Sequence, residues 1–329
     1  MTRSETAVRA PLRDASARHA QLVADVQRGL GSRPRSLPSK YFYDAHGSDL
    51  FDQITRLPEY YPTRTERGIL LAHADEIAAT TGAELLVELG SGTSEKTRLL
   101  LDALAARGRL RRFVALDVDP GVLAGAAAEL RERYPELSIE PVEADFEHPL
   151  PAVVHEGPRL VVFLGSTIGN LTPAERQPFF RGIAGQLSPG DHFLLGADLV
   201  KPPARLVPAY DDAAGVTAAF NRNVLRVLNA ELGGDFEVES FEHVARWNAQ
   251  EEWIEMWLRA PRAMTVQLPG ADLVIRLEAG EEIRTEISAK FRRDPLTEEL
   301  RSAGLRVVAW MSDPAQDFAL ALTTPSAAR

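Results

Sequence analysis

The sequence contains no cysteine, and no apolar run reaches the ~18 residues that a membrane-spanning helix needs. The absence of cysteine excludes disulfide bonds, thiolate nucleophiles and cysteine-ligated zinc. The arginine-containing N-terminus lacks the apolar stretch that follows in a secretory signal. We therefore expect a cytoplasmic protein with no membrane partner.

Basic residues are also fewer than acidic ones. The 329 residues include 37 lysines and arginines against 47 acidic residues, a formal net charge of −10. This balance argues against nucleic acids and anionic membranes as partners. The seven histidines include no H-E-x-x-H pair, so no metal site is predicted. With 45% hydrophobic and 26% charged residues, the chain resembles a soluble globular protein and is long enough for two domains.

The segment from Leu85 to Thr97, LLVELGSGTSEKT, predicts a strand, a glycine-rich turn and the start of a helix. Glycines let the backbone approach a ligand closely, and a helix N-terminus offers free N–H groups with a partial positive charge. Thr93 or Ser94 is expected to cap the helix, whose leucines lie at 100–104. The segment favours a nucleotide-like ligand, although a lone G-x-G also fits a structural turn.

Three ligand classes use such a turn, and Glu95 separates them. A phosphate-binding P-loop (G-x-x-x-x-G-K-[ST]) and a dinucleotide site (G-x-G-x-x-G) each need a glycine where Glu95 stands. S-adenosylmethionine carries no phosphate, so its E/D-x-G-x-G turn does not need that glycine. Glu88, Gly90 and Gly92 match this third pattern.

Acidic residues recur at later strand ends. Short apolar strands are predicted at 113–117, 139–143, 160–164 and 193–195, with connections typical of βα units. Asp117 ends the second strand, where doubly wound folds hold ribose hydroxyls. Asp145 can accept a hydrogen bond from an adenine amino group, and Phe146 can pack on its ring. Five strands in this order favour a nucleotide-binding α/β sheet over a purely structural turn.

The βα alternation stops after Lys201-Pro202-Pro203. A helical stretch at 209–232 is followed by predicted antiparallel strands at 236–247, 253–260, 264–268 and 273–277, then by a helix at 295–303 and a hairpin of 307–310 with 318–322. This order predicts an α/β fold, a class I methyltransferase (Rossmann-like) sheet with an inserted α+β substrate-binding domain. The predicted domains are 1–200, which includes an N-terminal segment before the sheet, the insertion 201–289, and the return to the sheet at 290–329.

Long segments of the chain resemble the L-histidine Nα-methyltransferases of ergothioneine biosynthesis. The matching segments are 40–44, 47–54, 58–66, 87–97, 161–173, 209–223 and 290–292. The resemblance runs from about residue 20 to about residue 322, and residues 1–20 show no match. It implies a monomeric class I enzyme that moves three methyl groups from S-adenosylmethionine to the α-amine of L-histidine. The products would be hercynine and S-adenosylhomocysteine, with no metal involved.

The resemblance also implies roles for individual residues. The cofactor would be lined by Gly90, Ser91, Lys96, Asp117, Asp145 and Phe146. In catalysis, the Gly165 carbonyl would hold the substrate amine, and Tyr43 would lie near the path of its proton. The remaining substrate contacts would be Asn170 and Tyr210 at the carboxylate, Phe51 and Tyr60 closing with Tyr43 over the substrate, Met256, Glu286 and Ser288 at the imidazole, and Thr217 and Phe220 nearby.

Without the resemblance, several of these residues also fit ordinary structural roles. The three tyrosines can be half-buried packing residues, and Met256 can belong to the core of an apolar strand face. Glu286 can lie with the preceding acids at 278, 281 and 282 on a solvated face.

The chemistry leaves other functions open as well. In-line displacement at a sulfonium requires an aligned, deprotonated amine, and no dedicated general base is visible in the sequence. One alternative is a methyltransferase for another amino acid or for a protein, which the pair Glu286 and Ser288 disfavours because it suits an imidazole. Another is a non-catalytic nucleotide-sensing module, and calorimetry with S-adenosylhomocysteine and with ATP separates it from an enzyme.

Overall fold

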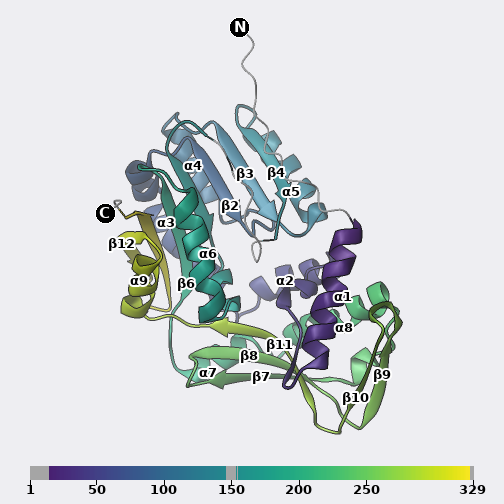
Figure 1. Cartoon of the computed structure of the whole chain (residues 1–329). Helices are drawn as coiled ribbons and strands as arrows, with labels where there is room; N and C mark the ends of the chain where they lie inside the picture. The colour runs from purple at the N-terminus through teal and green to yellow at the C-terminus, as the bar shows by residue number, and fades with distance from the viewer. Residues whose placement is uncertain (1–14, 146–152, 154, 327–329) are drawn as a thin grey trace. The chain divides into compact units, whose positions relative to one another are not determined.

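The structure is a computed structural model that describes residues 15–145, 153 and 155–326 (Figure 1). The described chain divides into two compact units. The first contains residues 62–200 and those from 291 onward, and the second contains those up to 61 together with 201–290. The N-terminal segment up to residue 61 thus belongs to the same compact unit as residues 201–290. The predicted division placed this segment in the 1–200 domain, and that division stays a prediction.

The first unit is built on a seven-stranded sheet with the strand order β12-β13-β6-β5-β2-β3-β4 (Figure 1). The strands are β2 (Leu85–Leu89), β3 (Arg112–Asp117), β4 (Ser138–Glu143), β5 (Arg159–Phe163), β6 (His192–Asp198), β12 (Leu305–Ser312) and β13 (Phe318–Pro325). Strands β4, β3, β2, β5 and β6 pair in parallel, while β13 pairs antiparallel with β6 and β12. The five predicted parallel strands and the terminal hairpin are confirmed.

Burial explains the apolar runs of these strands. All five residues of β2 are buried, as are six of the seven in β6. Parallel sheets with both faces covered give such continuous apolar sequences. The helices of this unit are α3 (Tyr61–Thr81), α4 (Arg98–Ala106), α5 (Pro120–Arg133), α6 (Pro173–Gln186) and α9 (Arg293–Ser302), with a 3₁₀ turn η2 (Thr167–Asn170).

Adjacent parallel strands end at the same edge of a sheet. The carboxyl ends of β3, β2 and β5 are neighbours in this order. The segments after Leu89, Asp117 and Phe163 therefore meet at one edge, where open α/β sheets bind their ligands. This edge carries Gly90, Ser91 and Asp117 of the predicted cofactor residues.

The predicted cap of the helix after β2 is wrong. Helix α4 begins at Arg98, after Thr97, and no side chain caps it. Ser94 adopts a left-handed conformation with φ of +52°, and its hydroxyl donates to Glu88 Oε2 at 3.0 Å. The hydroxyls of this turn satisfy a buried carboxylate instead of the helix end, a competition that a local pattern does not reveal.

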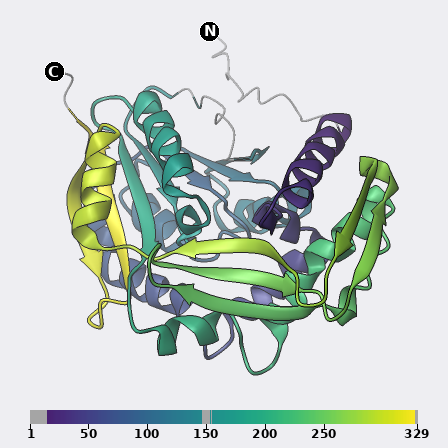
Figure 2. The ribbon, with the colours of Figure 1, turned by 60° about the horizontal axis from the view of Figure 1, so that its bottom comes forward.

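The second unit contains a four-stranded sheet of order β1-β11-β8-β7 and a two-stranded β9–β10 ribbon. Its strands are β1 (Arg35–Ser36), β7 (Glu242–Asn248), β8 (Trp253–Arg259), β9 (Met264–Leu268), β10 (Leu273–Leu277) and β11 (Glu282–Ala289). Its helices are α1 (Ala15–Gly31), α2 (Ala45–Thr55), α7 (Pro203–Leu206) and α8 (Val216–Leu232), with 3₁₀ turns η1 (Ser39–Phe42), η3 (Val207–Ala209), η4 (Val238–Ser240) and η5 (Pro269–Ala271). Figure 2 shows β7, β8 and β11 lying side by side.

The insertion contains one strand that the sequence pattern did not predict. β11 was not expected, because its sequence EIRTEISA places acids and an arginine among the apolar residues. The predicted helix at 209–232 begins as α8 only at Val216. The predicted strand at 236–247 begins as β7 only at Glu242, after η4. The strands at 253–260, 264–268 and 273–277 are confirmed within one residue.

No helix in the part of the chain that the structure describes is long and apolar enough to span a membrane.

Candidate functional site

The turn after β2 exposes its backbone. Gly90 and Gly92 have φ angles of +64° and +49°, which glycine adopts without strain. A Cβ at Gly92 would meet no atom within 4 Å, so there is open space beside it. Gly92 N donates to Asp117 Oδ2 at 2.8 Å, and Ser91 N donates to Leu116 O at 3.0 Å. These bonds hold the turn against the end of β3.

Glu88 anchors this turn from inside the protein. It is 4% exposed, and it accepts hydrogen bonds from Ser94 Oγ at 3.0 Å and from Thr97 Oγ1. Burial raises its pKa to about 8, while the two hydroxyl donors and Lys96 act to lower it. Glu88 therefore shapes the turn through its hydroxyl contacts.

Asp117 closes the opposite side of the turn. Its carboxylate accepts from Gly92 N and from Asp119 N at 3.1 Å, and burial raises its pKa. Ala144 N donates to Asp117 O at 2.9 Å, which brings the residues after β4 beside it. Asp145 follows and is half-buried, whereas the predicted ring contact Phe146 lies outside the described residues.

The donors and acceptors of this edge fit a nucleoside. Among the described residues, buried Ser91 Oγ has no hydrogen-bond partner, so a ligand can satisfy it. The Asp117 carboxylate offers acceptors at the position that suits ribose hydroxyls. The open side of Gly92 admits a ligand close to the backbone.

Glu66 is a functional candidate that the sequence analysis did not single out. Its side chain is fully buried in α3 and accepts from Gly165 N with both oxygens, at 2.9 and 3.0 Å. Lys96 Nζ also donates to Glu66. A Cβ at Gly196 would lie 2.2 Å from Glu66 Oε1, so a larger residue there would displace the Glu66 carboxylate. Glu66 thus joins the predicted cofactor residue Lys96 to the predicted catalytic peptide at Gly165.

The loop after β5 carries Gly165 and Asn170. Gly165 has a φ of +75° and Ser166 one of +57°, so the chain turns sharply after the strand. Ser166 Oγ accepts from Asp198 N at 2.9 Å, which fixes the loop against β6. Asn170 ends η2 and is half-buried. The loop therefore places both predicted residues near the edge where β2 and β3 end.

The second unit gathers five predicted substrate residues into one aromatic cluster. The cluster consists of Tyr43, Phe51, Tyr60, Tyr210 and Phe220. Tyr43 lies 5.6 Å from Phe51 and 5.5 Å from Phe220, between ring centroids. Phe51 lies 6.2 Å from Tyr60, which lies 6.4 Å from Tyr210. Segments far apart in the sequence meet here through their rings, at spacings typical of edge-to-face aromatic pairs.

The backbone around Tyr43 is held by Asn223 of α8. Asn223 Nδ2 lies 2.7 Å from Asp44 Oδ1 and 3.0 Å from Phe42 O. Asp44 also caps α2 by accepting from Gly47 N at 2.7 Å. A Cβ at Gly47 would lie 1.7 Å from Phe42 O, so only glycine fits this corner. Tyr43 is thus presented on a rigid segment.

A polar triangle lies beside the aromatic cluster. Tyr210 OH and Ser288 Oγ are 2.8 Å apart, and Lys290 Nζ donates to them at 2.7 and 2.9 Å. All three side chains are buried. Lys290 was part of a matching segment, but it received no role from the sequence. Thr217, in the first turn of α8, is also buried and donates its N–H to Asp212 at 2.7 Å.

A β-bulge in β11 decides to which face of the sheet the Glu286 and Ser288 side chains point. The extra residue Thr285 stands unpaired in β11, so that Glu286 pairs with Met256 and Ser288 with Ile254. Met256 and Ile254 belong to the hydrophobic core of the unit, and directly paired residues share a face of the sheet. Without the bulge, Glu286 would alternate onto the other face, because a one-residue shift reverses the side-chain direction.

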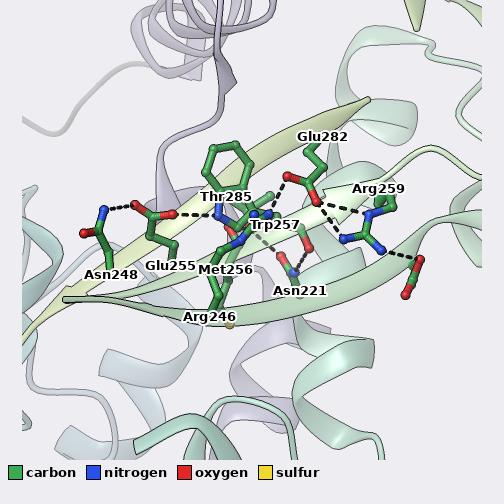
Figure 3. A network of polar contacts seen from close by, with 10 residues as sticks. Asn221, Arg246, Asn248, Glu255, Met256, Trp257, Arg259, Glu282 and Thr285 are labelled. Carbon is green, nitrogen blue, oxygen red and sulfur yellow. Dashed lines mark hydrogen bonds and ion pairs between the residues drawn. The ribbon is translucent and has the colours of Figure 1, made fainter. Parts of the chain in front are cut away.

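The other face of this sheet carries paired charges (Figure 3). Glu255 accepts from the indole N–H groups of Trp253 and Trp257 at 2.8 and 3.0 Å. Glu282 accepts from Arg259 Nη2 at 2.9 Å. By contrast, no hydrogen bond from the described residues reaches the carboxylate of Glu286. Burial raises its pKa to about 8, although its surface stays partly accessible and the charge of Lys290 acts to lower the pKa.

Buried hydrogen bonds connect the bulge to Tyr210. Thr285 Oγ1 lies 2.6 Å from Asn221 Oδ1 and 3.0 Å from Met256 O (Figure 3). Asn221 Nδ2 lies 2.8 Å from His243 Nδ1, so the second ring nitrogen of His243 carries the hydrogen that Tyr210 O accepts, also at 2.8 Å. Burial lowers the pKa of His243, which favours this neutral form. The residues at 221 and 243 were not predicted to contribute.

No group of three or more histidine, aspartate and glutamate side chains in the described part of the chain could hold a metal ion.

Comparisons with known proteins identify the family to which this chain is similar. The family model described as histidine-specific methyltransferase, SAM-dependent, matches residues 22–325. The histidine N-alpha-methyltransferase of Mycolicibacterium smegmatis is 60% identical over 301 residues, which are 92% of this chain and 94% of that protein. The protein of the same name from Mycobacterium tuberculosis is 56% identical over 304 residues, 92% of this chain and 95% of that protein. Ergothioneine biosynthesis protein 1 of Neurospora crassa is 30% identical over 285 residues, 84% of this chain and 32% of that protein.

Proposed function

Because the chain belongs to the family of S-adenosylmethionine-dependent histidine-specific methyltransferases, we propose that it trimethylates the α-amine of L-histidine. The products are hercynine, an intermediate for ergothioneine, and S-adenosylhomocysteine. One observation supports the choice of histidine above the others. The bulge turns Glu286 and Ser288 to the face of Met256, where an acid without a hydrogen bond can accept from an imidazole N–H.

The cofactor role falls to residues of the first unit. Gly90, Ser91 and Asp117 bind the nucleoside, with Asp145 and Phe146 at the adenine and Lys96 beside the turn. The unsatisfied hydroxyl of Ser91 supports this assignment. When bound, S-adenosylmethionine supplies a methyl group on a sulfonium, which needs no metal for activation. We therefore propose a metal-free reaction.

The substrate roles follow the donors and acceptors available. The Gly165 carbonyl accepts from the amine, and Glu66 holds that peptide through its N–H. Asn170 and Tyr210 donate to the carboxylate, while Glu286 and Ser288 bind the ring. The aromatic and apolar residues that cover the substrate are Tyr43, Phe51, Tyr60, Phe220 and Met256, with Thr217 behind them.

Alignment and desolvation of the amine provide the catalysis. Well-oriented reactants can gain roughly 7–11 kcal/mol over a bimolecular encounter. The amine must be neutral to attack, and a site of low dielectric favours its neutral form. Tyr43 stands on a segment fixed by Asn223 and Asp44. It can relay the amine proton: its oxygen accepts that proton while its own hydroxyl hydrogen passes to water.

The protein is further proposed to act as a cytoplasmic monomer, without nucleic-acid or membrane partners. The net charge of −10 supports the absence of nucleic-acid and membrane partners, since polyanions and anionic lipids would be repelled. Sedimentation of the purified chain at micromolar concentration tests the monomer, for which a single species of 36.1 kDa is expected.

Incubation with histidine and S-adenosylmethionine, followed by mass spectrometry, tests the activity. A product three methyl groups heavier than histidine is expected. Glu286→Ala should mainly weaken histidine binding and reduce discrimination against phenylalanine and tryptophan, because the unpaired acid would no longer reject their rings. Asn170→Ala should instead weaken all three amino acids, which share the carboxylate. A protein that binds ATP but not S-adenosylhomocysteine would contradict the proposal.

A further inference from the structure

Lys290 is a buried cation for which the proposed reaction has no role so far. Its side chain is 4% exposed, and it stands two residues beyond Ser288 and four beyond Glu286. Its ammonium lies 4.6 Å from the centroid of the Tyr210 ring, in addition to its bonds to both hydroxyls. A buried ammonium has to be compensated by acceptors and by opposite charge. The two hydroxyl oxygens and the nearby Glu286 provide this compensation.

The bonds within the triangle limit which hydrogens Tyr210 and Ser288 can offer to a substrate. An ammonium only donates, so both Tyr210 and Ser288 use an oxygen lone pair to accept from Lys290. The bond between the two hydroxyls, at 2.8 Å, uses the hydrogen of one of them. When Tyr210 directs its hydrogen to a substrate carboxylate, Ser288 has to donate to Tyr210. Ser288 then has no hydrogen for the ring and offers only a lone pair.

We propose that Lys290 is a positioning residue that determines ring specificity: by holding both hydroxyls as acceptors, it makes Ser288 select a ring that points an N–H group at it. This inference rests on the proposed roles of Tyr210 and Ser288 in histidine binding. Lys290 acts through these two residues and need not touch the substrate.

The selection extends to Glu286. A ring that donates to Ser288 presents its second nitrogen to the acid, either as an N–H facing a carboxylate or as a bare nitrogen facing a carboxylic acid. In both cases one proton is shared between Glu286 and the ring. A ring without any N–H group, such as thiazole, cannot donate the hydrogen bond that Ser288 Oγ is left to accept. The triangle thus accounts for discrimination against a ring that has the size of imidazole but lacks its donor.

Lys290→Met tests the inference, and the chain contains a matched control. Lys201 is also a buried lysine, 8% exposed, whose Nζ donates to Tyr61 OH at 2.7 Å and lies 4.4 Å from the centroid of that ring. Lys201→Met therefore removes the same kind of contact from a tyrosine that has no proposed substrate role. Lys290→Arg serves as the conservative variant that restores a cationic donor, and Ser288→Ala removes the acceptor while Lys290 stays.

The readout is the ratio of the dissociation constants of L-4-thiazolylalanine and L-histidine, measured by calorimetry with S-adenosylhomocysteine present. For wild type the ratio is expected to be on the order of 100, the effect of one charge-assisted hydrogen bond. Lys290→Met and Ser288→Ala should lower this ratio to about 10 or less. In the first variant the Ser288 hydroxyl is free to donate to the ring, and in the second it is absent, so neither variant requires a ring N–H. The KM for histidine should rise in both, while the affinity for S-adenosylhomocysteine stays unchanged. Lys290→Arg should recover part of the ratio, and Lys201→Met should keep the wild-type value.

Two results would overturn the inference and remain distinct from failure of the proposed function. A wild-type ratio in Lys290→Met, or in Ser288→Ala if the first variant does not fold, shows that ring selection does not depend on the triangle. An equal fall in Lys201→Met shows a general effect of losing a buried cation. Wild-type protein that does not bind histidine at all contradicts the proposed function itself.

Discussion

Buried carboxylates of this protein differ in what they contact. Glu66 accepts from a backbone N–H and from Lys96, and Glu88 accepts from two hydroxyls. Glu286 receives no hydrogen bond from the described residues. An acid that is satisfied by the protein supports its fold, whereas an accessible acid without a donor is available for a ligand. Glu286 is therefore the one of the three to which we assign the substrate ring.

Glu88 makes the stability of the protein depend on pH. Its pKa, about 8, lies above the ordinary value of 4.5, so the folded state binds the proton more tightly than the unfolded state. The free energy of unfolding should then fall as pH rises from about 5 to 8, by at most ~1.4 kcal/mol per pH unit from this group. Glu88→Gln stays neutral, so its stability relative to wild type should increase over that range.

Urea unfolding at pH 5, 6.5 and 8 measures this difference. Glu129→Gln is the control, because Glu129 is exposed and paired with Arg98 at the surface. A difference between Glu88→Gln and wild type that does not change with pH would show that Glu88 is ionised in both states.

Asp117 is expected to bind the ribose of the cofactor. Asp117→Asn keeps an oxygen for Gly92 N but loses the charge and the acceptor for Asp119 N, so it tests the ligand contact while the bond to Gly92 stays. Affinity for S-adenosylhomocysteine should fall roughly 10- to 100-fold, the usual effect of a charge-assisted hydrogen bond. Calorimetry with Asp102→Asn as an exposed control measures it, and an unchanged affinity would remove Asp117 from the cofactor site.

At the scale of elements, the bulge in β11 decides which side chains face the core side of the sheet. Ile283 pairs with Leu258 before the bulge, and Glu286 pairs with Met256 after it. The residues of β11 on the core side are therefore at odd positions before the bulge and at even positions after it. Bulges recur next to active sites, where they re-aim a side chain. Here the bulge places Glu286, the acid that we propose to bind the ring, on the face opposite Glu255 and Glu282.

Thr285→Val tests whether the bulge supports substrate binding. Valine keeps the shape but loses the hydroxyl, leaving Asn221 Oδ1 without its donor. The loss should destabilise the protein by about 1–3 kcal/mol and weaken histidine binding, because Asn221 also reaches Tyr210 through His243. Affinity for S-adenosylhomocysteine should not change.

Thr323→Val provides the matched control. Thr323 is a buried strand threonine of the first unit, and its hydroxyl donates to Phe193 O at 3.1 Å. A comparable loss of stability is expected, without loss of histidine affinity. Equal histidine binding in both variants would reduce Thr285 to a purely structural residue.

At the scale of the whole molecule, the chain passes between its two units after residues 61, 200 and 290. The proposed cofactor residues lie in the first unit, and the proposed ring-binding residues lie in the second. Each set is assembled from segments distant in sequence. The first unit also carries Gly165 and Asn170, for which we propose contacts to the substrate amine and carboxylate.

The protein is predicted to methylate each histidine three times. The amine, methylamine and dimethylamine must all be accommodated, and Gly165 adds no side chain to obstruct them. The trimethylated product has no lone pair left, so the reaction stops there. Mass spectrometry over time should show the trimethylated species as the final product, and monomethylhistidine that persists after the cofactor is renewed would contradict this.

Much of the first unit could be predicted from local patterns. The apolar runs of β2 to β6 and the glycine turn at 90–92 were recognised because a buried parallel strand and a positive φ each leave a direct signal in the sequence. The roles of the hydroxyls at 94 and 97 were not predicted, because their partner Glu88 is brought to them only when the turn folds back.

The sequence by itself determined the sheet, the absence of thiol chemistry and, through long matching segments, the family. Each of these depends on residue type and on order along the chain. Only the tertiary structure decided that Glu286 faces Met256, that Lys290 joins Tyr210 to Ser288, and that Glu66 holds Gly165. These depend on strand register and on contacts between distant segments, because a one-residue bulge reverses a face without changing the local pattern.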